Sequence, residues 1–166
     1  YAHIKITATE LSTNEIMQLL PTATPNALYF VQSSMQRLQQ EMPLLREQYS
    51  CHLLASDPLK ISMDKSNPQS SKTSISLKKL ATLPLAFKSP SFDVMPSLVQ
   101  ILLDSGIPLN LKYCSNSDAS LIKYIRQNMA VTLFTKSNST SVNMESFITI
   151  PIKERIYVTL CFLVPK

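Results

Sequence analysis

The stretch from residue 112 to residue 136, KYCSNSDASLIKYIRQNMAVTLFTK, constrains the fold more than any other part of this 166-residue chain. It opens on the strand-like KYC, passes through the polar turn SNSDAS, and then carries apolar residues at helical spacing, Leu121, Ile122 and Ile125. The apolar run AVTLF that follows is typical of a buried strand. The stretch therefore predicts a strand, a turn, a helix and a strand, with the free N–H groups of the helix start facing outward from the turn.

The beginning of the chain shows the same alternation. Residues 3–10 alternate apolar and polar side chains as a strand does, and Ser12 and Glu15 have the spacing of a capping box at a helix start. Residues 27–31, ALYFV, form a short apolar run that is typical of a buried parallel strand. Strands that alternate with helices predict an α/β protein with mostly parallel sheets.

The middle of the chain continues the pattern less regularly. Residues 42–55 predict one or two strands, and the turn-rich residues 57–74 predict an excursion on the surface. Ser76 is placed to cap a short helix, LKKLA, and residues 83–87, LPLAF, predict another buried strand.

Two residues mark the ends of later elements. A helix with Pro96 in its first turn has an apolar stripe and reaches Gly106, which is suited to a left-handed helix end. Residues 148–165 are strand-like throughout, and Pro151 predicts a sheet edge or a break within them.

Three strand-to-helix turns, at residues 9–13, 88–91 and 115–117, are rich in serine or threonine. Helix capping explains each turn by itself, but three turns of the same kind favour a shared cleft for an anion or polar ligand. Lys88 is either a charge partner for that ligand or an exposed lysine at the end of a strand. The candidate ligand-binding residues are Ser12, Thr13, Lys88, Ser89, Ser91, Ser115, Asn116 and Ser117.

The chemistry of an enzyme is poorly represented. Both histidines, His3 and His52, lie in strand-like runs, and no cluster has the spacing of metal ligands. The single glycine, Gly106, excludes Gly-rich phosphate loops and dinucleotide fingerprints. We therefore expect a binding module with no catalytic residue, no metal and no cofactor.

Charge and cysteine usage add two expectations. The formal charge of +5 comes from bases spread along the chain, which favours scattered surface lysines over a nucleic-acid footprint. The three cysteines are far apart in the sequence and lie in strand-like runs, which favours buried, reduced thiols in a cytoplasmic protein. No apolar run is long enough to span a bilayer, so no membrane partner is expected.

The order of these motifs resembles the effector-binding domain of LysR-type bacterial transcriptional regulators. Residues 1–4, YAHI, resemble the family's Tyr-Pro-x-Val strand entry, and residues 26–29, NALY, resemble its Asp-Leu-Ala-Ile strand. Residues 43–59 are similar to its crossover strand, which ends in His-Pro-Leu, and residues 115–135 to its later turn, helix and strand. The sequence departs from the family at several positions, among them Asp57 in place of the histidine and Asn128 in place of a glycine.

The resemblance implies a two-lobed, periplasmic-binding-protein-like (type II) α/β fold with mostly parallel sheets and two crossover hinge strands. Residues 1–46 would form part of the first regulatory lobe, residues 47–156 the second, and residues 157–166 the returning crossover strand. Because the chain begins with Tyr1 rather than Met, we expect a fragment or a processed product, and the resemblance implies that it lacks the first strand and helix of the effector domain.

The same resemblance implies a function. The domain would sense a small polar or anionic metabolite in the cytoplasm, form a homo-oligomer (dimer or tetramer), and meet DNA only through a winged helix-turn-helix domain absent from this chain. One alternative is a solute-binding protein of a transporter, which shares the two-lobed fold and needs an upstream signal or lipid anchor. Another is a small-molecule enzyme that depends on Asp93, Asp118 or His52.

Overall fold

The computed structural model describes the residues that follow here, and all structural statements refer to them. They are residues 7, 9, 11, 13–22, 26–34, 37, 38, 40, 43, 47–89, 96–138 and 147–166. The strand predicted at residues 3–10 lies almost wholly outside this set, as do Ser12 and Ser91.

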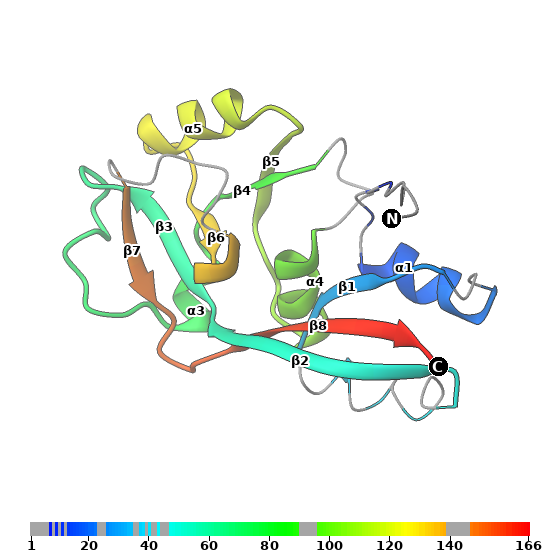
Figure 1. Ribbon diagram of the computed structural model, residues 1–166. Coiled ribbons are helices and arrows are strands. Elements are labelled where there is room, and N and C mark those ends of the chain that lie inside the picture. Colours follow the sequence, from blue (N-terminus) through cyan, green and yellow to red (C-terminus); the bar gives the residue numbers. More distant parts are fainter. Residues whose placement is uncertain are drawn as a thin grey trace.

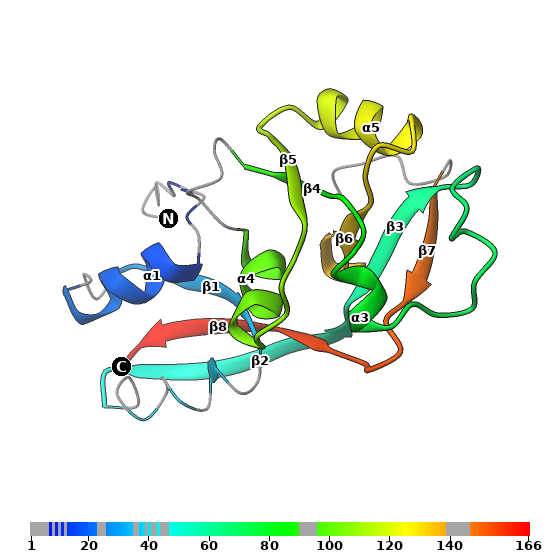
Figure 2. The ribbon, with the colours of Figure 1, turned by 180° about the vertical axis from the view of Figure 1, so that it is seen from behind.

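Two long antiparallel strands run side by side along one edge of the molecule (Figures 1 and 2). They are β2 (Tyr49–Pro58) and β8 (Tyr157–Pro165), and their register shifts between Leu53 and Ala55. A shorter strand, β1 (Tyr29–Ser33), pairs with the other side of β8, so the strand order is β1-β8-β2. Among the described strands, β2 therefore forms one edge of this sheet.

A second sheet has the order β6-β3-β7, and both of its pairings are antiparallel. Its strands are β6 (Thr132–Phe134), β3 (Lys60–Asp64) and β7 (Phe147–Pro151). Pro151 is the last residue of β7, which is an edge strand of this sheet, as its missing N–H donor predicted.

The remaining two strands, β4 (Leu85–Lys88) and β5 (Leu111–Ser115), pair in parallel. The prediction of mostly parallel sheets is therefore wrong for the described strands, since only this strand pair and two isolated bridges are parallel. The path of the chain explains the difference. β2 leads away toward β3 and β8 returns from β7, so the two run in opposite directions when they pair. β1, expected to be parallel, then borders the returning β8 and is antiparallel too.

The described helices are short and agree well with the local signals in the sequence. They are α1 (Thr13–Leu19), followed by a 3-10 turn at Leu20–Thr22, then α3 (Leu77–Leu80), α4 (Ser97–Asp104) and α5 (Asp118–Arg126), with a second 3-10 turn at Lys136–Asn138. The Ser76 hydroxyl accepts the N–H of Lys79 at 3.2 Å, which confirms the predicted cap of α3. Gly106, at φ +73°, confirms the left-handed end of α4, and Asn128, at φ 57°, takes the same conformation after α5. None of the described helices is long and apolar enough to cross a membrane.

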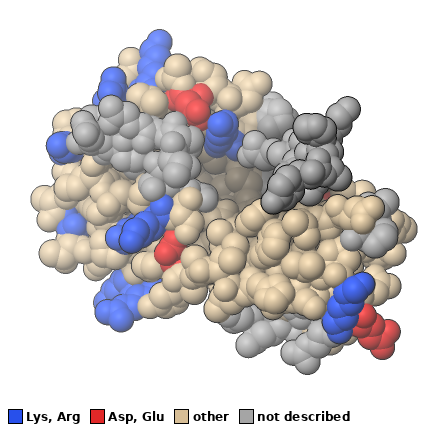
Figure 3. Space-filling view, in the orientation of Figure 1, with Lys and Arg blue, Asp and Glu red and all other residues tan. Residues whose placement is uncertain are grey.

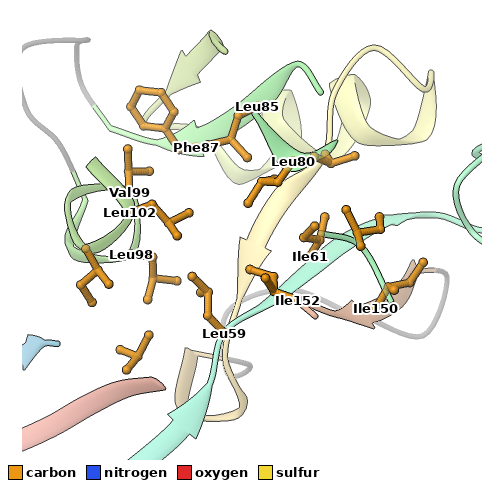
Figure 4. Close-up of a cluster of buried hydrophobic side chains, with 14 of the residues drawn as sticks. Leu59, Ile61, Leu80, Leu85, Phe87, Leu98, Val99, Leu102, Ile150 and Ile152 are labelled. Atoms are coloured by element: carbon orange, nitrogen blue, oxygen red, sulfur yellow. The ribbon is translucent and has the colours of Figure 1, made fainter. Parts of the chain in front are cut away.

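The larger of two hydrophobic clusters, which we call the β3 core, surrounds β3. Ile61 and Met63 are fully buried and Leu59 is 1% exposed, so the prediction of a surface excursion at residues 57–74 is wrong for its first half. The residues typical of turns on either side of β3 make this short strand of alternating polar and apolar residues difficult to recognise in the sequence. Side chains from α4 and β3 point into the same core (Figure 4). The buried members of the β3 core are Leu59, Ile61, Met63, Ile75, Leu80, Leu85, Phe87, Leu98, Val99, Ile101, Leu102, Val131, Ile150, Ile152 and Val158.

The smaller cluster, which we call the β8 core, lies between α1 and the β1-β8-β2 sheet. It is tied together by the Tyr49 hydroxyl, which donates to the Leu20 carbonyl at 2.8 Å in a buried position. Apolar side chains also lie on the solvent side of this sheet, since Phe30 is 60% exposed and contacts Phe162 with ring centroids 4.7 Å apart. The buried members of the β8 core are Ile16, Leu20, Val31, Leu38, Tyr49, Cys161 and Leu163.

Candidate functional site

The carboxyl ends of β4 and β5 lie next to the start of α5, where the sequence predicted a polar-ligand site. Lys88 and Ser115 are paired in the parallel register, and the N–H of Ser89 donates to the Ser115 carbonyl at 3.0 Å. Asn116 and Ser117 follow β5 directly, and α5 contacts both strands (Figures 1 and 2). The fold thus brings Lys88, Ser89, Ser115, Asn116 and Ser117 together. We call these five residues the β4–β5 turn cluster.

Much of the cluster's polar chemistry is used within the turn. The Ser117 hydroxyl accepts the N–H of Ser120 at 3.4 Å as the N-cap of α5, and the Ser115 hydroxyl accepts the N–H of Ser117 at 3.1 Å. Capping therefore explains these two serines. Because a hydroxyl that accepts a hydrogen bond keeps its own hydrogen for donation, both can still donate to a ligand oxygen.

Lys88 is an exposed residue at the end of β4 whose charge is balanced locally. Its ammonium lies 3.3 Å from Oδ1 of Asp118, and it also donates to Oδ2 at 3.4 Å. Asp118 is the first residue of α5, where a carboxylate is stabilised by the helix dipole. Because exposed ion pairs of this kind contribute only about 0–1 kcal/mol, Lys88 can exchange Asp118 for a ligand anion at little cost.

The remaining candidates divide into two groups. Ser12 and Ser91 lie outside the described residues, and Thr13 is the first residue of α1, with only its backbone described. The contribution expected from the first lobe therefore stays a prediction. Ser89 belongs to the cluster but is only 4% exposed, so its side chain lies beneath the surface of the turn.

Several buried hydroxyls were missed in the sequence, and two of them are register partners on neighbouring strands. Ser33, at the end of β1, is the register partner of Thr159 on β8, and they are 2% and 0% exposed. Neither hydroxyl has a hydrogen-bond partner in the described part of the chain, and leaving such a group buried costs about 1–3 kcal/mol. The sequence signal that could have found them is the alternation of a strand. Each lies two residues from a buried apolar residue, Val31 on β1 or Cys161 on β8, and therefore on the same inward face.

The cysteines also differ from the expectation. All three are free, but Cys51 is exposed, Cys114 is half-buried and only Cys161 is buried. Although Cys51 and Cys161 are far apart in the sequence, the pairing of β2 with β8 makes them diagonal neighbours on adjacent strands. Burial first, and this contact second, raise the pKa of Cys161 to about 12.

The groups that an enzyme on this fold would need are dispersed. Asp118 is paired with Lys88, His52 is exposed on β2, and Asp93 lies outside the described residues. Within the described ranges no three histidine, cysteine or acidic side chains gather as metal ligands would. The geometry at the β4–β5 turn cluster suits binding through hydrogen bonds and one ammonium group.

Comparison with solved structures shows which known fold this chain resembles. No protein-family model and no curated protein matches the sequence. Among solved structures, HinK, a LysR family transcriptional regulator from Pseudomonas aeruginosa, matches 95% of this chain with a TM-score of 0.59 and 14% identity. The CcmR regulatory domain of Synechocystis PCC6803, in complex with 2-PG, matches 93% with a TM-score of 0.63 and 11% identity.

The chain has the fold of LysR effector-binding domains. A third structure, the effector binding domain of QuiR in complex with shikimate, agrees, with a TM-score of 0.57 and 14% identity over 90% of this chain. The resemblance noted in the sequence is thus confirmed for the fold. The chain spans about half the length of the HinK chain (52%), 70% of the CcmR domain and 68% of the QuiR domain.

Proposed function

We propose that this chain is the effector-sensing part of a LysR-type transcriptional regulator and that it binds a small polar or anionic metabolite. The β4–β5 turn cluster carries the proposal, because it joins several hydroxyls, a helix start and the Lys88 ammonium at the carboxyl ends of two parallel strands. Solved structures of this fold that contain 2-PG or shikimate support it.

We further propose that the domain consists of two type II lobes, residues 1–46 and 47–156, with residues 157–166 returning to the first. The two separate hydrophobic clusters support this division, since the β8 core and the β3 core share no buried member. β2 and β8 would be the crossover strands, because they lie in the sheet beside the β8 core and continue toward β3 and from β7. A ligand held by both lobes would favour one inter-lobe geometry through its differential affinity.

The regulator would act in the cytoplasm as a homo-oligomer, a dimer or tetramer, and would reach DNA through a domain that this chain does not include. We propose binding without turnover at the β4–β5 turn cluster. The exchangeable Lys88–Asp118 pair supports this role, because a bound anion would release Asp118 from Lys88 and change the electrostatics at the start of α5.

A thermal-shift screen of organic acids, amino acids and sugars identifies the effector, and variants then test the cluster. Ser117→Asp keeps a residue favoured at a helix N-cap but adds a negative charge, and Lys88→Gln removes the ammonium group. Losing one hydrogen bond to a charged ligand costs about 1.5–3 kcal/mol, so Kd rises roughly 10- to 100-fold in Lys88→Gln.

Ser71→Ala, at an exposed serine in the turn after β3, is the matched control and leaves the ligand-induced shift unchanged. The quantity compared is the difference in Tm with and without ligand, because Ser117→Asp also alters the stability of the free protein. Equal ligand-induced shifts in the wild type, Lys88→Gln and Ser117→Asp would show that the effector binds elsewhere.

A further inference from the structure

The pairing of β2 with β8 brings two of the three cysteines together on one face of the sheet. In the register, Cys51 pairs with Leu163 and Leu53 pairs with Cys161, so Cys51 and Cys161 are diagonal neighbours on adjacent strands. Side chains two residues apart on a strand share a face, and diagonal pairs across strands are within reach of each other. The influence of Cys51 on the pKa of Cys161 agrees with this placement.

The two sulfurs differ sharply in their access to solvent. Cys51 is exposed on β2, the edge strand, whereas Cys161 is 2% exposed inside the β8 core. A reagent in solution therefore reaches Cys51 first, and Cys161 is reached only through Cys51. Cys114 is half-buried on β5, in another sheet, and takes no part in this contact.

We propose that Cys51 and Cys161 are a reversible oxidation site that forms a disulfide by exchange with a small-molecule disulfide of the glutathione class. The Cys51 thiolate attacks one sulfur of the oxidised reagent, which breaks the reagent's S–S bond and releases one reduced thiol. The Cys161 sulfur then attacks Cys51 in the mixed disulfide and releases the second thiol. Two protein thiols are oxidised, one reagent disulfide is reduced, and the two protein protons end on the two released thiols.

The geometry makes this disulfide easy to reduce. Cβ atoms on a sheet diagonal are somewhat less than about 7–8 Å apart, whereas a disulfide needs about 3.5–4.5 Å, so β2 must shift along β8 near Cys51. The movement is feasible because β2 is an edge strand with a register irregularity between Leu53 and Ala55, two to four residues beyond Cys51. A bond that holds the strands in this shifted position is strained, and strained disulfides have the more oxidising potentials found in regulatory sites.

The bond would act on the two strands that we propose as the connection between the lobes. A cross-link between Cys51 and Cys161 fixes β2 against β8 next to the irregular register, so it restricts the strands on which inter-lobe movement depends. The effect rests on the proposed two-lobe function, but the bond itself forms whether or not that function is right. Oxidation and effector binding can therefore be tested separately.

The full chain is incubated with oxidised glutathione, the remaining free thiols are alkylated, and the product is analysed by intact-mass and peptide mass spectrometry. Compared with the reduced protein, the expected product has lost two hydrogen atoms and contains a peptide cross-link between Cys51 and Cys161. Its one remaining thiol, at Cys114, is the one that is alkylated. Cys114→Ser, the matched control, gives the same cross-link. Cys161→Ala retains a stable mixed disulfide at Cys51, and Cys51→Ser retains both remaining thiols.

Two results would overturn the proposal. One is a wild-type protein that accumulates the mixed disulfide at Cys51 while Cys161 stays free. The other is a Cys51–Cys51 link between two copies, seen as a dimer on non-reducing gels. A second measurement does not depend on the variants: dithiothreitol removes the Cys51–Cys161 cross-link from the oxidised wild type and restores two free thiols.

Discussion

The β3 core and the β8 core are both built from apolar residues, but they differ in how completely the surrounding structure shields them from solvent. Ile61, Met63 and Leu102 in the β3 core are fully buried, and strands or helices surround them. The sheet beside the β8 core leaves Phe30 and Leu53 at 60% and 57% exposure. Figure 3 shows a largely uncharged surface over this part, at the lower right, while basic side chains gather on the left over β3 and α5.

This difference in shielding from solvent suggests that the two clusters contribute differently to stability and to movement. A core that excludes water on all sides supplies stability, whereas an incompletely closed one opens at lower free energy and is available for movement or contact. The proposed oxidation site and the buried Ser33–Thr159 pair both lie in the sheet of the β8 core. We therefore expect substitutions to act more strongly on stability in the β3 core and more strongly on regulation in the β8 core.

The largest expected effect compares two leucines that are equally buried. Leu102→Ala in the β3 core should destabilise the protein near the upper part of the range of about 2–5 kcal/mol, because the packed surroundings cannot relax into the cavity. Leu163→Ala in the β8 core should fall near its lower end, because the edge strand β2 can move inward. Urea unfolding followed by circular dichroism measures both, and equal losses would contradict the distinction between the cores.

A smaller effect is expected where Tyr49 ties β2 to the end of α1. Tyr49→Phe removes the donor to the Leu20 carbonyl and should cost about 1–2 kcal/mol, while Tyr157→Phe, at a 48% exposed residue, should stay within about 0.5 kcal/mol. An equal cost in the two variants would show that this bond does not hold the β8 core together.

Tyr49 should also make the free energy of unfolding depend on pH in the alkaline range. Desolvation by burial, followed by the neighbouring Tyr29, raises the pKa of Tyr49 above its ordinary 10.0. A raised pKa means that the stabilisation is complete below the ordinary value and is lost as pH rises through the folded-state value. Unfolding curves across this alkaline range should show a decline in the wild type that is weaker in Tyr49→Phe, and parallel curves would contradict it.

The smallest effect tests the link between the two regions. Arg37, next to the β8-core residue Leu38, donates to Oδ2 of Asp104 on α4 at 3.4 Å, and Asp104 is 39% exposed. A double-mutant cycle with Arg37→Gln and Asp104→Asn should give a coupling of about 0.2–1 kcal/mol, since Asn keeps an acceptor for Gln100. A coupling above about 2 kcal/mol would indicate that the two cores act as one unit.

The sequence predicted elements whose causes are local. Ser76 and Ser117 cap the helices they were expected to cap, and Gly106 and Asn128 take left-handed conformations, because these signals lie within a few residues of the structure they determine. β3 was missed because lysine, aspartate, asparagine and proline surround its three buried residues and mimic a loop.

Features that depend on distant pairing were beyond the sequence. The antiparallel direction of β1 follows from the insertion of β8 beside it, and no signal within residues 27–31 specifies that partner. The same holds for the contact between Cys51 and Cys161 and for the pairing of Ser33 with Thr159. Of the proposed site, the sequence predicted the β4–β5 turn cluster because it is made of two short local turns.

The ladder between β2 and β8 also governs how fast the native state is reached. Its partners, from Tyr49 with Pro165 to Pro58 with Tyr157, are separated by all of the strands and helices of the β3 core. Closing so long a loop is entropically costly until the intervening chain has compacted, and topologies rich in such contacts fold slowly. During synthesis β2 leaves the ribosome long before β8 has been made, so the apolar residues of β2 remain without their partner strand during that time. Chaperones that shield unpaired edges would meet this protein at β2.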